Sequence, residues 1–488
     1  MAEAKESIPQ TNVKETPPEE TFDPAAEKAL LLKCDIHVVP ILFLLFLLSF
    51  IDRINIGNAR LQGLEKDLKM KNHDYNIALF IFFIPYVLLE IPSNLILKKV
   101  APSTWLSSII GGWGIVTVCQ GVTQSFAGLV VCRFLLGVFE AGFVPGSIYL
   151  ISMYYKRHEL QTRFNFFFCA SIIAGAGSGF LAYAIANMDG VSGYRAWRWI
   201  FILEGIVTVV VAVASKFIIP DWPETAKFLN EDERRLLIAR LAADNKGATM
   251  DRLDKKAIKR CLKDVKLYLG GSWVRILMYF GIVNTGYATS FFTPTILNQL
   301  GWTAVRAQVM TVPVFFVATV VTLSCAFASD RLRHRYGFTM LGCCVATSGY
   351  VILLCQKHVS VGVRYAAVFL VTAGGYIAQP VVLVWLSNNM GGHYKRAISS
   401  SMQIGIGNSG GLVASNVFIN SEKPLYPTGF GTSLALVWLC GLSCTAFFFW
   451  CRRENQIRDA GGRDDRYSLP EDELNNIGDD HPAFRFTY

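Results

Sequence analysis

The sequence predicts an all-α membrane protein with twelve transmembrane helices arranged in two pseudo-symmetric six-helix bundles. Hydrophobic residues make up 52% of the 488 residues and charged residues only 17%, whereas soluble domains carry about 25% charged residues. Apolar stretches of about 20 residues, long enough to cross a hydrocarbon core about 30 Å thick, recur along the chain. The longest polar break, at 220–272, divides these stretches into six and six.

Each apolar stretch predicts one membrane-spanning helix, and the polar segments between them predict the loops. The twelve spans are expected at 37–58, 76–97, 104–123, 127–150, 162–186, 197–219, 273–296, 306–328, 337–356, 364–386, 397–419 and 430–451. Five regions follow from them: a disordered cytoplasmic N-terminal tail (1–36), an N-terminal bundle (37–219), a cytoplasmic central loop (220–272), a C-terminal bundle (273–451) and a cytoplasmic C-terminal tail (452–488).

The central loop contains one further predicted helix. Asn230 and Glu233 have the spacing of a capping box, which marks a helix start. The residues that follow supply an apolar side at Leu236, Leu237, Ile238 and Leu241. We expect a short amphipathic helix on the cytoplasmic surface, and the alternative is a solvated linker that is only transiently helical.

The basic residues orient the chain in the membrane. Lys and Arg gather in the loops after the even-numbered spans, for example at Lys156–Arg157 and Lys395–Arg396. Cytoplasmic loops carry such an excess, so both termini are expected in the cytoplasm. This distribution explains the net charge of +9 without a nucleic-acid partner.

Four ionisable residues lie inside two spans of the first half. Asp52 and Arg53 fall in the first span, and Arg133 and Glu140 fall in the fourth. A charged group at membrane depth costs about 2.5–3.5 kcal/mol on insertion scales and usually faces a partner or a water-filled cavity. The pattern indicates a pathway for an ion and a substrate.

Counting residues from the span ends places these groups in depth. Asp52 and Arg133 each lie about six residues from the same membrane surface, so an Asp52–Arg133 ion pair is expected if the helices are neighbours. Glu140 follows Arg133 by seven residues, on nearly the same face and roughly 10 Å deeper. Gly137, between them, is expected to leave room for water or substrate.

Six longer stretches carry further information: DRINIGNARLQGLEKDL (52–68), EIPSNLILKK (90–99), RFLLGVFEAGFVPGSIYLISMYYKRHELQTR (133–163), WRWIFILEG (197–205), PDWPETAKFLNEDER (220–234) and IGIGNSGGLVASNVF (404–418). Together they resemble the major facilitator superfamily, in particular the anion:cation symporter family and its fungal allantoate/nicotinate permease branch. The loop after the second span, LKKVAPSTW, departs from the superfamily's usual Gly-rich Asp-Arg signature. The resemblance implies the two-bundle fold and transport by alternating access.

The resemblance also implies roles for the charged residues. Arg53 corresponds to an arginine that contacts the substrate carboxylate. Asp52 and Glu140 correspond to carboxyls that carry protons, and Arg133 to the arginine that pairs with the first of them. The alternative is a buried ion-pair network that only fixes helix packing.

The second half contributes neutral polar groups to the expected substrate site. Asn408 corresponds to a polar family position near the substrate, and Tyr287 and Gln379 are further candidates because buried amides and hydroxyls can orient a small ligand. Glu90 and Glu204 lie in spans without an evident partner, and either a transport role or a structural hydrogen bond stays open.

The predicted function is secondary active transport: proton-coupled symport of a small organic anion, a carboxylate such as nicotinate, allantoate or a related vitamin or nitrogen source. Two alternatives stay open, an exporter of an acidic fungal metabolite and a non-transporting nutrient sensor that signals through its tails. We expect no enzymatic activity, no metal and no cofactor besides the coupling proton. The protein is expected to be a monomeric, multi-pass protein of the plasma membrane, and its partners are the anion, protons and lipid.

Overall fold

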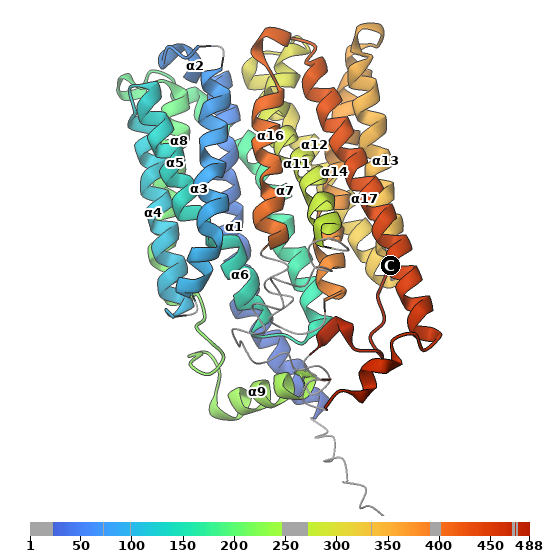
Figure 1. Cartoon of the computed structure of the whole chain (residues 1–488). Helices are drawn as coiled ribbons and strands as arrows, with labels where there is room; N and C mark the ends of the chain where they lie inside the picture. Colours follow the sequence, from blue (N-terminus) through green and yellow to red (C-terminus); the bar gives the residue numbers. More distant parts are fainter. Residues whose placement is uncertain are drawn as a thin grey trace, which may run out of the picture.

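The computed structural model describes residues 23–71, 73–97, 99–245, 272–332, 334–390, 402–470, 474 and 477–488. Within these ranges the regular structure is entirely helical, and the long helices run side by side in two groups (Figure 1). Among the described residues, nine helices are long and apolar enough to cross a membrane. Together with the helices at 74–97, 272–299 and 402–417, these nine match the twelve predicted spans, so the expected all-α membrane fold with twelve helices is confirmed.

The first group of helices forms the N-terminal bundle and follows the predicted spans closely. Its helices are α1 (Pro24–Leu61), α3 (Asp74–Leu97), α4 (Pro102–Val122), α5 (Phe126–Glu140), α6 (Phe143–Ser152), α7 (Arg157–Ile185) and α8 (Ala196–Ile218). A short helix, α2 (Leu64–Asp67), connects α1 to α3. The fourth predicted span is divided into α5 and α6 by a break immediately after Glu140.

The second group forms the C-terminal bundle. Its helices are α11 (Ser272–Gln299), α12 (Ala304–Leu332), α13 (Arg335–Leu354), α14 (Val361–Asn388), α16 (Gly410–Val417) and α17 (Pro427–Asp459). Residues 402–408 are helical and precede α16 in the eleventh predicted span, whose residues 397–401 lie outside the described part. Short 3-10 turns are Ala186–Met188, Val191–Gly193, Gln356–His358, Asn420–Glu422, Asp464–Ser468 and Gly478–Asp480.

Two region boundaries differ from the predicted ones. Helix α1 begins at Pro24, where Asp23 Oδ1 accepts a hydrogen bond from the Ala25 amide at 3.0 Å, so 24–36 are helical rather than part of a tail. Helix α17 continues to Asp459, eight residues beyond the predicted end. Window hydropathy ends the spans before these extensions, because charged residues such as Lys33, Asp35 and Arg452 interrupt them. Residues 1–22 lie outside the described part.

The predicted helix of the central loop is present as α9 (Glu231–Asn245). Glu233 Oε2 accepts a hydrogen bond from the Asn230 amide at 2.8 Å, which is one half of the expected capping box. Glu233 also forms an ion pair of 2.7 Å with Lys33 of α1. The helix therefore lies against the first turns of α1, at the end of the molecule where α1 begins (Figure 1). Residues 246–271 of this loop fall outside the described ranges.

The last residues of the chain pack against the C-terminal bundle. Asn455 of α17 donates to the Phe486 carbonyl at 2.8 Å and accepts from the Phe486 amide at 2.9 Å. Asn389 makes the same pair of bonds with Thr487, at 3.0 and 2.7 Å. Phe486 is buried. The end of the tail is thus fixed across α17 and the chain following α14.

The bundles meet most closely away from the end where α1 begins and α17 ends, which we call the terminal end. At the opposite end, a Cβ on Gly175 of α7 would lie 2.5 Å from the Phe315 ring of α12, and Gly179 abuts Thr311. Asn76 of α3 donates to the Ser415 carbonyl of α16 at 2.6 Å. The α7 glycines therefore allow the two helices to approach closely.

Candidate functional site

Arg53 lies at the junction of the two bundles and joins them. From α1 its Nη2 forms a 2.6 Å ion pair with Glu140 Oε1 at the end of α5, and its Nε donates to the same oxygen at 3.2 Å. Its Nη1 donates to the Tyr287 hydroxyl of α11 at 2.6 Å. The two charged side chains are 3% and 1% exposed, so the pair is sealed from solvent.

Aromatic rings enclose the guanidinium of Arg53. Its central carbon lies 4.9 Å from the Tyr86 ring centroid, 5.0 Å from Phe82 and 5.6 Å from Phe50. A guanidinium within about 6 Å of a ring face gains cation–π attraction, which is stronger when water is excluded. The rings offset part of the desolvation penalty of the buried cation and leave its planar edge to oxygen partners.

Glu140 keeps one oxygen free. Ser49, one turn before Arg53 on α1, donates to the Oε1 that also accepts from Arg53. The other oxygen, Oε2, is buried without a hydrogen-bond partner. An unpaired buried acceptor costs about 1–3 kcal/mol, and protonation of that oxygen or binding of a donor at that place would remove the penalty.

Asp52 faces away from this pair, and the predicted Asp52–Arg133 ion pair is wrong. Its Oδ2 accepts from Trp113 Nε1 of α4 at 3.1 Å and from Thr208 Oγ1 of α8 at 3.0 Å. Consecutive residues on a helix point about 100° apart. With Arg53 directed toward the bundle junction, Asp52 is directed into the N-terminal bundle. Counting residues predicted its depth but could not predict its direction.

Arg133 lies near Arg53 without pairing with a carboxylate among the described residues. Its Nη1 donates to the Arg53 carbonyl at 3.3 Å, and its Nε and Nη2 have no hydrogen-bond partner. The side chain is buried. Gly137 does not open a space between Arg133 and Glu140 either, because the Phe82 backbone of α3 fills the position of a Cβ.

Two of the neutral candidates join the charged cluster. The Tyr287 hydroxyl, which accepts from Arg53, lies 3.3 Å from Asn408 Oδ1 in the geometry of a donated hydrogen bond. Tyr287 also stacks on Phe291, with ring centroids 5.7 Å apart. Phe292 instead stacks on Phe418, 4.6 Å away. Arg53, Glu140, Tyr287 and Asn408 therefore form one continuous polar chain across the junction.

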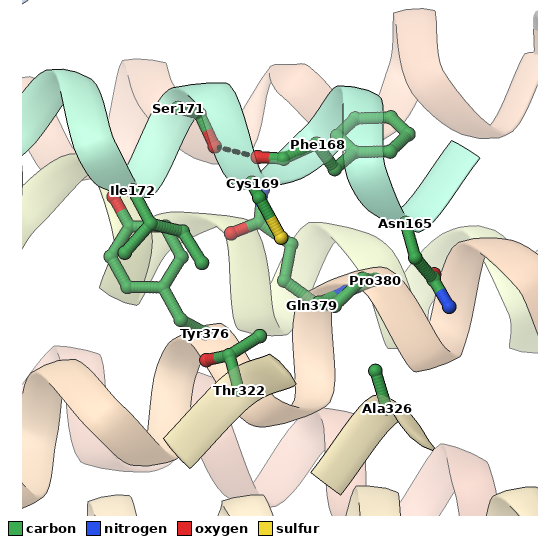
Figure 2. Close-up of a pocket in the computed structure, with 10 residues that line it drawn as sticks. All are labelled: Asn165, Phe168, Cys169, Ser171, Ile172, Thr322, Ala326, Tyr376, Gln379 and Pro380. Atoms are coloured by element: carbon green, nitrogen blue, oxygen red, sulfur yellow. Dashed lines mark hydrogen bonds between the residues drawn. The ribbon is translucent and has the colours of Figure 1, made fainter. Parts of the chain in front are cut away.

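Gln379 lies in a separate pocket between the bundles. The pocket is small in this conformation, with a cavity volume of about 20 Å³, and it lies between α7, α12 and α14 (Figure 2). Its lining residues are Asn165, Phe168, Cys169, Ser171, Ile172, Thr322, Ala326, Tyr376, Gln379 and Pro380. Gln379 Oε1 and Thr322 Oγ1 are buried without partners, so the pocket offers unused hydrogen-bonding groups beside apolar and aromatic surface.

The pocket adjoins the helix that carries Tyr287. A Cβ on Gly286 would lie 2.9 Å from Gln379 Oε1, and Ser290 Oγ lies 3.2 Å from the Tyr376 hydroxyl. Gly286 and Ser290 are one turn apart on α11, on either side of Tyr287 in sequence. The charged cluster and the pocket are therefore neighbours along one helix, although Arg53 does not line the pocket.

The two remaining buried glutamates have different surroundings. Glu204 of α8 accepts a hydrogen bond from Asn55 of α1, a partner that the sequence did not reveal. Glu90 of α3 is 1% exposed, and neither of its oxygens has a hydrogen-bond partner. For Glu204 the geometry favours a structural hydrogen bond inside one bundle.

The sequence analysis did not identify several residues that contact the candidate site. Ser49 lies four residues before Arg53, and Phe82 lies four residues before Tyr86, so helical spacing places each pair on one face. That spacing could have identified them once Arg53 was chosen as the centre. Trp113 and Thr208 carry no comparable signal, because their role depends on the direction of Asp52.

Comparisons with known proteins cover almost the whole chain. A family model described as Major Facilitator Superfamily matches residues 42–415. The MFS-type transporter cnsO of Penicillium expansum is 36% identical over 482 residues, which cover 96% of this chain and 92% of that protein. The high-affinity nicotinic acid transporter of Saccharomyces cerevisiae is 32% identical over 469 residues, covering 95% of this chain and 85% of its own.

Solved structures show the same arrangement of helices. A D-xylose-proton symporter superposes with a TM-score of 0.65 at 14% identity, covering 85% of this chain and 97% of that chain. A bacterial homologue of the human lysosomal transporter Spinster, in an inward-facing and occupied conformation, superposes with a TM-score of 0.62 at 15% identity. It covers 88% of this chain and 98% of its own. At such identities the likeness concerns the fold.

Proposed function

Because the chain belongs to the Major Facilitator Superfamily and is therefore a multi-pass membrane transporter of a small molecule, we propose that it carries a small organic anion together with protons by alternating access. The observation that carries this proposal is the position of Arg53. It is a buried cation that contacts a carboxylate of one bundle and a hydroxyl of the other.

The substrate carboxylate would compete with Glu140 for Arg53. A guanidinium presents a planar fork that holds a carboxylate through two hydrogen bonds. When substrate occupies that fork, Glu140 loses its cation, and an isolated carboxylate in a water-excluded site favours the neutral form. Substrate binding would therefore draw a proton onto Glu140. Charge balance at one arginine thereby couples the anion to the proton.

Asp52 is proposed as a second proton-binding carboxyl, separate from the arginine. Its Oδ1 has no hydrogen-bond partner, and its Oδ2 accepts only from the neutral donors Trp113 and Thr208. Arg133 would act indirectly, as a positioning residue. Its Nη1 donates to the carbonyl of Arg53 and so helps to hold that turn of α1. A substrate role for Asn408 rests on its hydrogen bond with Tyr287.

The pocket beside Gln379 is proposed to take the body of the substrate. It combines the amide of Gln379 and the hydroxyl of Thr322 with the Tyr376 ring, a combination that suits a small ring with a polar substituent. The relative named a high-affinity nicotinic acid transporter makes a pyridine carboxylate the first compound to test. Import across the plasma membrane, with both termini cytoplasmic, is part of the same proposal.

Uptake measurements test the proposal. Yeast lacking its own related permeases would express the chain and receive labelled nicotinate, allantoate or pantothenate at acid and at neutral pH. We expect uptake of one of these anions, stronger at acid pH and abolished by an uncoupler. Uptake that ignores both pH and the uncoupler would reject proton coupling. Surface expression without uptake, combined with export of an acid from loaded cells, would favour the exporter alternative.

A further inference from the structure

A carboxyl that receives no hydrogen bond from the described residues is buried where the two bundles touch. Glu90 of α3 is 1% exposed, and both of its oxygens lack a hydrogen-bond partner. Each of the other three buried carboxyls at the core of the described N-terminal bundle accepts at least one hydrogen bond: Asp52, Glu140 and Glu204. No hydrogen bond from the described residues therefore offsets the burial penalty of Glu90.

Glu90 ends a stripe of α3 that packs on the other bundle. Asn76, Phe83 and Glu90 are spaced by seven residues, which places them on nearly one helix face. Asn76 donates to the Ser415 carbonyl at 2.6 Å, Phe83 abuts Gly411, and Glu90 abuts Gly405. We call this contact the α3 seam, and Glu90 is its member nearest the terminal end.

The contact at Gly405 is a tight one. A Cβ at that position would lie 3.0 Å from Glu90 Oε2 and 3.4 Å from its carboxyl carbon. The carboxyl therefore rests directly on the backbone of the opposite bundle. Any movement that separates α3 from the helix of 402–408 exposes this carboxyl, and any return movement buries it again.

Few charged groups of the described part of the chain lie near Glu90. Arg53 of α1 acts on it through space, and Tyr86 of its own helix and Tyr279 and Tyr287 of α11 are within electrostatic range. Arg53 is already paired with Glu140 of α5. The other stretches packed on α3, which are α4, α6 and 402–417, contain no Asp, Glu, Lys, Arg or His.

The charge state of Glu90 must therefore follow the state of the seam. An ionised carboxylate without donors is expensive to bury, whereas a neutral acid loses much less on leaving water. When the seam is closed the group holds a proton. When the seam opens, water supplies donors and the O–H bond can break, with the proton passing to that water.

We propose that Glu90 is a further proton-binding carboxyl of the transport cycle, loaded while the α3 seam is closed and unloaded when the seam opens toward the terminal end. The proposal rests on the proposed proton coupling and adds a residue to it. It differs from Glu140 in mechanism, because the trigger is separation of the bundles rather than competition for Arg53.

A spectroscopic test measures the protonation of Glu90 and does not require a known substrate. The full-length protein in nanodiscs is titrated, and pH-induced infrared difference spectra record the carbonyl stretch of protonated carboxyl groups. We expect Glu90→Gln to lose one component of that band and Glu90→Asp to retain a shifted one. Ser93→Ala is the matched control, because Ser93 is an equally unpartnered polar group on α3 that faces Gly142 of its own bundle. Identical spectra for Glu90→Gln and the wild type would overturn the proposal.

A flux measurement distinguishes this inference from the proposed function. In proteoliposomes, labelled nicotinate and a pH dye report the number of protons carried per anion. We expect Glu90→Gln to keep exchange of labelled for unlabelled nicotinate but to carry fewer protons per anion. A wild type that moves nicotinate without protons would defeat the proposed coupling, and the infrared titration would still decide whether Glu90 titrates. An unchanged ratio in Glu90→Gln, with a coupled wild type, would defeat the role of Glu90 alone.

Discussion

At the residue scale, the site consists of one buried cation whose partners come from both bundles. Arg53 contacts Glu140 on one side and Tyr287 on the other. Removing one member of a buried ion pair costs about 3–5 kcal/mol, because the remaining charge is left without compensation. For substitutions at this site, both anion binding and the amount of expressed protein must therefore be measured.

Arg53→Lys tests whether the planar fork matters beyond the charge. Lysine keeps the positive charge but presents a single ammonium, so a two-point contact with a carboxylate is lost. We expect the apparent affinity for the transported anion to fall about tenfold or more, equivalent to about 1.4 kcal/mol. Uptake kinetics in cells with matched surface expression measure this. Arg306→Lys, at an exposed arginine of the opposite end, is the control, and wild-type affinity in Arg53→Lys would remove Arg53 from the anion site.

Glu140→Gln separates coupling from binding. The amide still accepts a hydrogen bond from Arg53 and Ser49, but it cannot take up a proton. We expect accumulation driven by a pH gradient to be lost while exchange of labelled for unlabelled anion continues. Glu204→Gln is the comparison, because Glu204 accepts from Asn55 within its own bundle and should keep gradient-driven accumulation. Accumulation that survives in Glu140→Gln would contradict the competition mechanism.

The buried ionisable residues of the candidate site could be selected from sequence, but their pairing could not. Ionisable residues in apolar spans stand out, and this pointed to Asp52, Arg53, Arg133 and Glu140. Depth follows from counting residues, whereas direction depends on how α1 is rotated in the bundle. That rotation turns Asp52 toward Trp113 and gives Glu140, rather than Asp52, an arginine partner.

At the element scale, hydropathy predicted the helices within the membrane, whereas the helix ends and the tail outside the membrane differ from the hydropathy prediction. The predicted spans correspond to observed helices because a helix in lipid must satisfy every backbone group internally. The early start of α1 and the fixed C-terminal tail depend on caps and on side chains such as Asn455 that bond the backbone. The tail contacts join segments distant in sequence, and a single cap residue such as Asp23 produces no periodic pattern.

The contact between α9 and α1 predicts a pH dependence outside the membrane. The hydrogen bond from Lys33 holds the pKa of Glu233 below its ordinary value of 4.5. A carboxyl with a lowered pKa stabilises the contact above its ordinary pKa, and this contribution is lost as the pH falls through the lowered value. We expect the amides of α9 to exchange faster with deuterium at pH values below the ordinary pKa than at neutral pH.

Hydrogen exchange with mass spectrometry on the protein in nanodiscs measures this change, after correction for the intrinsic effect of pH on exchange. Glu233→Gln should show the fast exchange already at neutral pH, because the ion pair with Lys33 is removed. Glu231→Gln, an exposed carboxyl of the same first turn, is the control. Equal protection of α9 in Glu233→Gln and the wild type at neutral pH would contradict the role of this ion pair.

At the scale of the whole molecule, the cross-bundle hydrogen bonds are distributed unevenly. Between described residues they lie at the level of Arg53 or beyond it, toward the opposite end. Examples are Asn76 with the Ser415 carbonyl, Arg60 with Asn420, and Gln308 with the Asn58 carbonyl. The pocket of Figure 2 lies on the terminal side of the tight α7–α12 glycine contacts. This conformation is therefore closed at the opposite end, and transport requires that those contacts open.

Gly179→Leu should hold the opposite end apart. Gly179 of α7 abuts Thr311 of α12, and a Cβ would also lie 2.8 Å from the Gln308 carbonyl, so a larger side chain cannot fit in the closed state. We expect a longer distance between spin labels at Lys71→Cys and Arg306→Cys, both exposed at that end, in a background with the exposed Cys119, Cys344 and Cys355 replaced by serine. Uptake should be lost while anion binding remains.

Gly431→Leu is the control, because the space around the Cβ position of Gly431 is open. Gly190→Leu is unsuitable, because Gly190 has a φ of 84° that a leucine rarely adopts. An unchanged label distance in Gly179→Leu would mean that the α7–α12 contact does not close this end.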